Sequence, residues 1–289
     1  MGIRRDRTKR KLWLNSKQYI LRKLEEFGME DCKPIGTPMD PGISLSKEDC
    51  PKTPEEIEAM RNIPYMSAVG SLLFLALLTR PDIAYVAGVL ARFNSNPGMA
   101  HWKAIKHVFR YLKGTTDLEL EYGPNANNSD LLTVLSDADL GGNKDNGRST
   151  TKYIIKVGSG VVSWCSKLQP IVTLSSTEAE FVSATITGKE VCAVRSLLSE
   201  LGYKVASPTC MWVDNQSAIQ VAKNPEHHGR MKHLDRDFYW LRDKVTHGIF
   251  MPKYLPTEDN GADMLTKALV KPKVEKFRSM MGLVNSNPV

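Results

Sequence analysis

The order of apolar and polar residues divides the chain into two regions. In the first region, up to Tyr122, apolar residues recur at three- and four-residue spacing, which is typical of helices. The expected helices cover 16–27, 54–60, a pair within 65–94 that is hinged at Arg80-Pro81, and 99–112. Residues 117–122 alternate Leu with Glu and predict a strand. Residues 1–12 hold six basic residues and one acid. They predict a solvated tail or turn, with a phosphate-contacting arm as the alternative.

A segment rich in Gly, Pro and Asn, residues 123–129, predicts a linker. The pattern after it predicts strands over 131–136, 151–157, 161–165, 209–213 and 249–255, and helices over 177–201, 216–223, 234–247 and from 263 to 269. We therefore expect a mainly helical region over 1–122, then a linker, then an α/β domain over 130–289. This domain should contain a mixed sheet with helices packed on it.

Composition narrows the class of protein. At 289 residues the chain exceeds the usual size of one domain, and its net charge of +7 weakly favours an anionic partner such as nucleic acid. The five cysteines are scattered and contain no C-x-x-C pair, which predicts free thiols in a reducing compartment. No secretory signal is evident, and the longest apolar run, 72–78, is too short to cross a bilayer. We expect an intracellular protein, cytoplasmic or nuclear, without a membrane partner.

Four acids stand at or beside the ends of apolar elements: Asp137, Glu178, Asp214 and Asp263. A carboxylate at the tip of a buried strand is costly unless a cation neutralises it. Magnesium prefers hard oxygen ligands, and two such ions can generate a nucleophile and relieve the charge of an attacked phosphate. We therefore predict that these acids converge on a pair of divalent metals.

Each acid also has a purely structural interpretation. Asp137 and its neighbour Asp139 are compatible with a turn after a strand. Glu178 ends a Ser-x-x-Glu capping box, Asp214 can cap the following helix, and Asp263 is favoured by a helix dipole. Only the joint pattern of the four acids supports the metal hypothesis.

Several long motifs carry a family resemblance. They are SDADLGG (136–142), GRSTTKY (147–153), VSWCSKLQ (162–169), SSTEAEF (175–181), VDNQSAI (213–219), HGRMKHLD (228–235) and YLPTEDNGADMLTKAL (254–269). Together they resemble the ribonuclease H domain of copia-type LTR retrotransposon Pol polyproteins. Upstream, residues 63–93 and 101–115 are similar to the stretch that follows the reverse transcriptase palm in those polyproteins, so the first region is expected to be thumb- or connection-like.

The resemblance implies a ribonuclease H-like fold that cuts the RNA strand of RNA–DNA hybrids with two Mg²⁺ ions, for which Mn²⁺ can substitute. Its catalytic and metal-binding acids fall on Asp137, Glu178, Asp214 and Asp263. Its nucleic-acid contacts are expected at His228, Arg230, Lys232, His233, Asn215 and Gln216. Recognition of the hybrid would use the backbone and the 2′-hydroxyls rather than base edges.

The chain departs from the family pattern at Leu140, where an aromatic residue is usual, at Leu168, where Lys is typical, and at Thr151-Lys152, where Ser-Gly is usual. None of these changes removes a carboxylate. The sequence also contains no Y/F-x-D-D polymerase motif. We therefore expect the C-terminal piece of a polyprotein, whose partner is the remaining reverse transcriptase with its palm and fingers, and no DNA synthesis by this chain alone.

Two functions from different classes follow. The first is a metal-dependent endoribonuclease, to which residues 1–122 would add affinity for the hybrid. The alternative is a catalytically inactive retroelement remnant that binds nucleic acid without cleaving it. An integrase core is disfavoured because Glu178 precedes Asp214 and the residue 35 positions beyond Asp214 is Ile249. No H-E-x-x-H metalloprotease motif is present.

Overall fold

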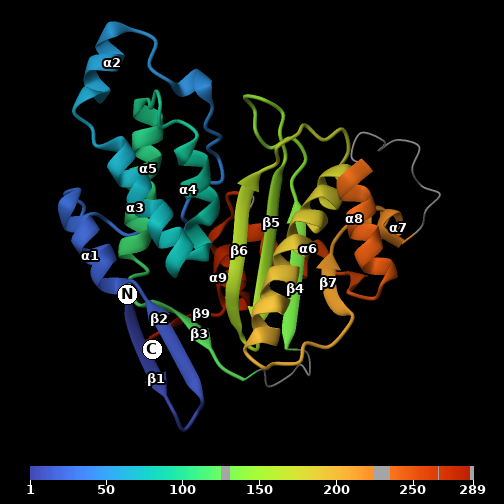
Figure 1. Ribbon diagram of the computed structural model, residues 1–289. Helices are drawn as coiled ribbons and strands as arrows, with labels where there is room; N and C mark the ends of the chain where they lie inside the picture. Colours follow the sequence, from blue (N-terminus) through green and yellow to red (C-terminus); the bar gives the residue numbers. More distant parts are fainter. Residues whose placement is uncertain (125–130, 224–234, 266, 287–289) are drawn as a thin grey trace. The chain divides into compact units, whose positions relative to one another are not determined.

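The computed structural model describes residues 1–124, 131–223, 235–265 and 267–286. The chain forms two compact units (Figure 1). Unit 1 contains Met1–Tyr122 together with Lys267–Val289, and unit 2 contains Gly123–Thr266.

Unit 1 combines a small sheet with a set of helices. Its strands are β1 (Gly2–Asp6), β2 (Lys11–Asn15), β3 (Leu118–Tyr122) and β9 (Leu283–Asn285), each antiparallel to its neighbour in the order β1-β2-β3-β9. Its helices are α1 (Lys17–Glu26), α2 (Pro54–Arg61), α3 (Tyr65–Leu78), α4 (Ala84–Ala91), α5 (Met99–Lys113) and α9 (Lys271–Met280), with short 3-10 turns η1 (Lys47–Asp49) and η2 (Pro81–Ile83). The predicted helices and the hinge at Arg80-Pro81 are confirmed, since α3 ends at Leu78 and η2 begins at Pro81.

Residues 1–12 do not form a tail, because this segment is the β1–β2 hairpin. The turn that was predicted as the other form of this segment lies at residues 7–10, which are exposed. Two of its bases are neutralised across the sheet by acids of β3. Arg4 pairs with Glu119, and Lys11 pairs with Glu121 at 2.7 Å. The Arg4 guanidinium also lies 3.9 Å from the ring centroid of Trp13. The run of bases is therefore stabilised by partners more than a hundred positions away, which local charge counting does not detect.

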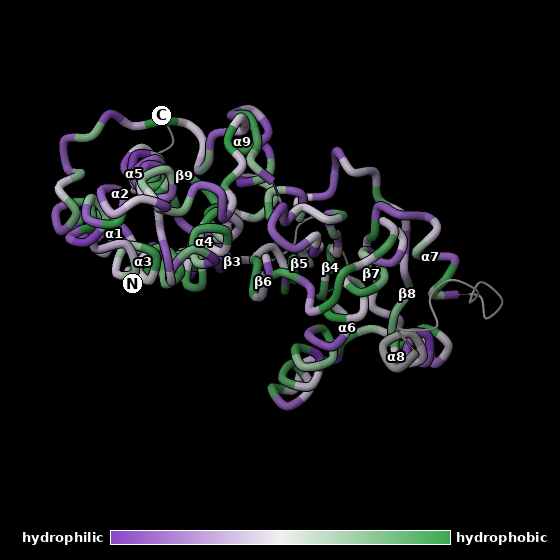
Figure 2. The backbone as a smooth tube through the Cα atoms, turned by 90° about the horizontal axis from the view of Figure 1, so that it is seen from above, coloured by the Kyte–Doolittle hydropathy of each residue, from purple (hydrophilic) through white to green (hydrophobic). Residues whose placement is uncertain are grey.

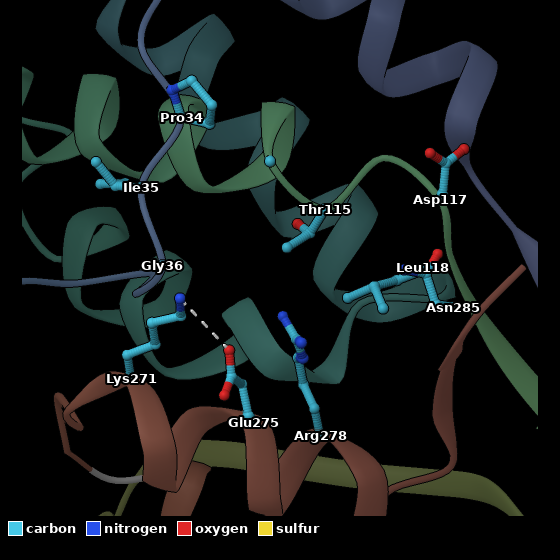
Figure 3. Close-up of a pocket in the computed structure, with 11 residues that line it drawn as sticks. Pro34, Ile35, Gly36, Thr115, Asp117, Leu118, Lys271, Glu275, Arg278 and Asn285 are labelled. Atoms are coloured by element: carbon cyan, nitrogen blue, oxygen red, sulfur yellow. Dashed lines mark ion pairs between the residues drawn. The ribbon is translucent and has the colours of Figure 1, made fainter. Parts of the chain in front are cut away.

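The second domain was predicted to extend to residue 289, but unit 2 ends at Thr266. Residues 267–289 belong to unit 1. In β9, Leu283 pairs with Leu120 of β3, and Phe277 of α9 is buried. Figure 3 shows Lys271 and Glu275 of α9 in a pocket of unit 1. The Lys271 ammonium lies 3.8 Å from the Glu275 carboxylate.

The helix expected over 263–269 is also displaced. A 3-10 turn, η6 (Gly261–Leu265), stands there, and α9 begins later with a proline in its first turn, where the missing N–H costs no hydrogen bond.

Unit 2 is built on a five-stranded sheet in the order β6-β5-β4-β7-β8. The strands are β4 (Leu132–Ala138), β5 (Thr150–Val157), β6 (Gly160–Leu168), β7 (Thr209–Val213) and β8 (Phe250–Tyr254). The helices are α6 (Ser176–Glu200), α7 (Gln216–Lys223) and α8 (Asp235–Thr246), with a 3-10 turn η5 (Thr257–Asp259) before η6. β4, β5 and β6 are antiparallel, whereas β7 runs parallel to β4 and β8 parallel to β7. The mixed sheet with flanking helices expected of a ribonuclease H-like fold is confirmed.

The core of unit 2 lies between the sheet and α6. Val134 of β4, Met211 of β7 and Phe181 of α6 are buried in one apolar cluster. Figure 2 shows α6 and α8 on the same side of the row of strands. β4 is the central strand of the sheet, with β5 on one side and β7 on the other. Its carboxyl end therefore lies beside that of the parallel strand β7.

Two expectations from composition can be compared with the structure. All five cysteines are free, as predicted. Among the described residues no single helix is long and apolar enough to cross a membrane; the pair α2 and α3, bent by 58°, meets the length and composition requirements only when the two are taken together.

Candidate metal centre

Two of the predicted acids meet because β4 and β7 are parallel neighbours. Leu135 of β4 lies opposite Trp212 of β7. Asp137 and Asp214 each stand two residues further along their strands, so both come to the same edge of the sheet. Asp137 is buried, and Asp214 is half-buried just after β7 ends.

The third member of the cluster is Glu180, from the first turns of α6. Asp137, Glu180 and Asp214 each offer a carboxylate oxygen, and these three oxygens lie within 4.8 Å of one another. Oε1 of Glu180 accepts a hydrogen bond of 2.8 Å from the backbone N–H of Ala138. Oε2 of Glu180 is buried and has no hydrogen-bond partner among the described residues. This oxygen is therefore available to a cation.

The electrostatics of the cluster favour a cation. Burial, followed by the negative charge of Asp137, raises the pKa of Glu180 to about 10. Burial and the charge of Asp137 also raise the pKa of Asp214, although the Thr257 hydroxyl opposes this by donating to Oδ2 of Asp214 at 2.9 Å. Three carboxylates are thus crowded into a site where their ionised forms repel each other.

The residues present fit a divalent ion. The donor set consists of carboxylate oxygens, which Mg²⁺ prefers, and Glu180 has a buried oxygen without a hydrogen-bond partner in the part of the chain that the structure describes. A divalent ion would offset the repulsion from Asp137, which adds to burial in raising the pKa values of Glu180 and Asp214.

The structure does not place Glu178 in this cluster. Its carboxylate instead accepts the backbone N–H of Leu174 at 2.9 Å, while its own N–H donates to the Ser175 hydroxyl at 3.2 Å. The Ser175 half of the capping box that the sequence suggested is present, but Glu178 accepts from Leu174, one residue before the N-cap, and not from the N-cap N–H itself. The physical reason is helical geometry: Glu180 stands two residues later, roughly 200° further around the helix, and this rotation turns it toward β4.

A stripe of polar residues along α6 explains why Glu180 faces the site. Ser183 donates to the backbone carbonyl of Asp137 at 2.6 Å, and Thr187 donates to the Ser136 hydroxyl at 3.1 Å. Glu180, Ser183 and Thr187 have spacings of three and four residues and are all buried. This pattern in an otherwise apolar interface is the signal that would have identified Glu180 from sequence.

Asp263 is linked to Asp137 by Lys152, which forms an ion pair with both acids. Lys152 of β5 lies opposite Asp137 in the register, and its ammonium donates both to Oδ2 of Asp137 and, at 3.2 Å, to Oδ1 of Asp263. Burial alone would lower the pKa of Lys152, but Asp137 and Asp263 raise it. Of the four predicted acids, the structure thus unites Asp137 with Asp214 and brings Asp263 beside them.

The remaining predicted residues are placed as follows. Asp139 accepts the backbone N–H of Thr150, which is a structural contact after β4. Asn215 caps α7 by accepting the N–H of Ala218 at 3.0 Å, and Gln216 is exposed at the first position of that helix. The predicted nucleic-acid contacts His228, Arg230, Lys232 and His233 lie outside the described residues.

Comparison with known proteins places this site in a family. The Retrovirus-related Pol polyprotein from transposon TNT 1-94 of Nicotiana tabacum is 44% identical over 283 residues, which are 98% of this chain and 21% of that protein. The chain belongs to the copia-type retrovirus-related Pol polyproteins. A second Pol polyprotein, from transposon RE1 of Arabidopsis thaliana, is 37% identical over 290 residues, 100% of this chain and 19% of that protein. This Pol-family chain thus spans about a fifth of the length of the curated relatives it matches.

The chain was also compared with models of protein families and with solved structures. No model of a known protein family matches this Pol-family chain. Among solved structures, LC11-RNase H1, isolated from compost by a metagenomic approach, covers 51% of this chain and 97% of its own length at 14% identity, with a TM-score of 0.36.

Proposed function

We propose that unit 2 is a divalent-metal-dependent ribonuclease that cleaves the RNA strand of RNA–DNA hybrids. The observation that carries the proposal is the convergence of Asp137, Glu180 and Asp214, with no described residue hydrogen-bonded to the buried Oε2 of Glu180. Membership of the Pol polyprotein family supports nucleic acid as the substrate, and the other parts of the parent polyprotein are the proposed protein partners.

Asp137, Glu180 and Asp214 would each supply a ligand to the ion. Bound Mg²⁺, or Mn²⁺ in its place, would supply charge neutralisation at the attacked phosphate and a water of lowered pKa. Asp137 is held by the central strand, Glu180 is oriented by the Ala138 N–H, and Asp214 is oriented by the Thr257 hydroxyl. These contacts fix the ligands before substrate arrives, so little reorganisation is required on binding.

The hybrid would be held near the same edge of the sheet. Gln216 is exposed beside Asp214, and Asn215 uses its side-chain oxygen as a cap, which leaves its amide NH₂ as the group that would contact substrate. His228, Arg230, Lys232 and His233 would add positive charge for phosphate contacts.

Cleavage of a labelled RNA–DNA hybrid in Mg²⁺ tests this function. We expect the wild type to cut the RNA strand, and Asp214→Asn and Glu180→Gln each to lose at least about a hundredfold in rate, because a metal ion supplies several kcal/mol to the transition state. Glu178→Gln is the matched control in the same helix and is expected to retain activity within about threefold. Equal loss in both glutamine variants would contradict the assignment of Glu180.

One observation favours the second candidate, an inactive remnant that binds nucleic acid. Lys152 already pairs with Asp137 and Asp263, two of the acids that the family resemblance assigns to metal. A folded wild type that binds the hybrid in Mg²⁺ and leaves its RNA strand intact would establish this alternative.

A further inference from the structure

We propose that the Lys152 ammonium serves as a resident cation between Asp137 and Asp263, so that unit 2 holds one divalent ion instead of two. The inference rests on the proposed function, since it takes Asp137, Glu180 and Asp214 as the ligands of the ion that remains. It concerns how many ions are bound and how tightly.

The position of Lys152 is fixed by the sheet. It stands opposite Asp137 in the β4–β5 ladder, so its Cα is set by backbone pairing on a central strand. The side chain is only 3% exposed, and a lysine is almost never buried to this extent unless it is paired. Both of its partners, Asp137 and Asp263, are buried as well.

The ammonium and a second ion would compete for the same oxygens. Lys152 donates to Oδ2 of Asp137 and to Oδ1 of Asp263, which are the atoms that a cation between these two acids would bind. Magnesium requires oxygen ligands at about 2.0–2.1 Å in near-octahedral geometry, so a second ion bound to both of these oxygens would need the space that the ammonium group occupies. The ammonium therefore excludes an ion from this position.

Charge balance still leaves room for one divalent ion. Lys152 offsets one of the four negative charges of Asp137, Glu180, Asp214 and Asp263 when all are ionised. Glu180 lies in one cluster with Asp137 and Asp214, and among the described contacts Lys152 makes no hydrogen bond to Glu180 or to Asp214. One ion would thus bind among Asp137, Glu180 and Asp214 while Lys152 remains in place.

Counting bound Mn²⁺ by electron paramagnetic resonance tests this inference on the full chain. We expect one ion per chain for the wild type and two for Lys152→Ser. The ion common to both should bind at least about tenfold more tightly in the variant, because a positive charge beside a shared ligand has been removed. Lys156→Ser is the matched control, since it removes a lysine from the same strand away from the acids, and it should bind one ion with unchanged affinity.

The outcomes separate this inference from the proposed function. Two ions in the wild type, or one in a folded Lys152→Ser, would overturn the inference and leave the ribonuclease proposal intact. No ion in the wild type, with Asp214→Asn indistinguishable from it, would instead remove the metal centre itself. If Lys152→Ser does not fold, Lys152→Met keeps the length of the side chain and removes its charge. A tenfold gain in Mn²⁺ affinity for Lys152→Met would support the inference, and unchanged affinity would overturn it.

Discussion

Buried charged side chains have different roles in the two units: those of unit 2 suit a metal ion, and those of unit 1 pair with each other. In unit 2 three acids crowd together, and one buried oxygen of Glu180 has no hydrogen-bond partner within the described ranges, which favours a cation from solution. In unit 1, Arg80 and Asp82 are almost completely buried and satisfy each other through two hydrogen bonds of 2.9 and 2.7 Å. Tyr111 donates a further bond of 2.7 Å to Asp82, and Arg80 also donates to Thr115. A fully paired cluster of this kind is structural.

The Arg80–Asp82 pair leads to a stability prediction. Asp82→Asn should lower the free energy of unfolding by about 3–5 kcal/mol, because it leaves the buried Arg80 charge uncompensated. Tyr111→Phe, which removes one hydrogen bond of the same cluster, is the control and should cost about 1–3 kcal/mol. Chemical denaturation monitored by circular dichroism measures both. Similar losses in the two variants would show that the charge of Asp82 contributes little.

The same pair predicts a dependence on pH. Burial alone would raise the pKa of Asp82, but Arg80 and Tyr111 lower it below its ordinary value. The stabilisation is therefore fully present above the unfolded value, near about pH 4, and is lost as the pH falls through the lower folded value. Between about pH 4 and pH 2, the free energy of unfolding should decrease more for the wild type than for Asp82→Asn. Parallel curves would contradict the assigned shift.

At the scale of elements, the N-terminal half of α6 has two roles. Ser175 and Glu178 satisfy backbone N–H groups at the start of the helix, while Glu180, Ser183 and Thr187 face β4. The motif SSTEAEF therefore contains one glutamate for the helix and another for the site. The hydrogen bonds of Ser183 and Thr187 to β4 fix the rotation that turns Glu180 toward Asp137.

Removing the cap should affect stability more than chemistry. Ser175→Ala is expected to destabilise unit 2 by about 1 kcal/mol, the usual cost of losing a serine N-cap. Mn²⁺ affinity should change by less than about threefold, because Ser183 and Thr187 still hold α6 against β4. Thermal unfolding and Mn²⁺ titration on the same sample measure the two effects. A loss of Mn²⁺ binding without a loss of stability would show that the cap positions Glu180 directly.

At the scale of the whole molecule, unit 1 is discontinuous and unit 2 is continuous. Unit 1 requires the C-terminal residues 267–286, which supply α9 and the edge strand β9. Every described residue of the proposed metal centre lies between positions 137 and 263, inside unit 2. Stability and metal binding should therefore respond separately to loss of the C-terminus.

Deletion of residues 267–289 tests this separation. The truncated chain should keep its Mn²⁺ stoichiometry, while β3 loses the partner of Leu118, Glu119 and Leu120 and exchanges its amide protons faster. Hydrogen exchange followed by mass spectrometry measures the second effect. Unchanged exchange in β3 would contradict the pairing with β9, and loss of Mn²⁺ binding would show that the metal centre depends on unit 1.

The sequence by itself determined most elements of both units and two of the three clustered acids. Strand ends such as Asp137 and Asp214 are visible in a linear pattern, because an apolar run that stops at an acid marks the edge of a sheet. Three features were decided only by the tertiary structure: the rotation of α6, which selects Glu180 over Glu178; the pairing of β9 with β3; and the register that sets Lys152 opposite Asp137. Each depends on contacts between segments far apart in the chain, and local periodicity carries no information about such contacts.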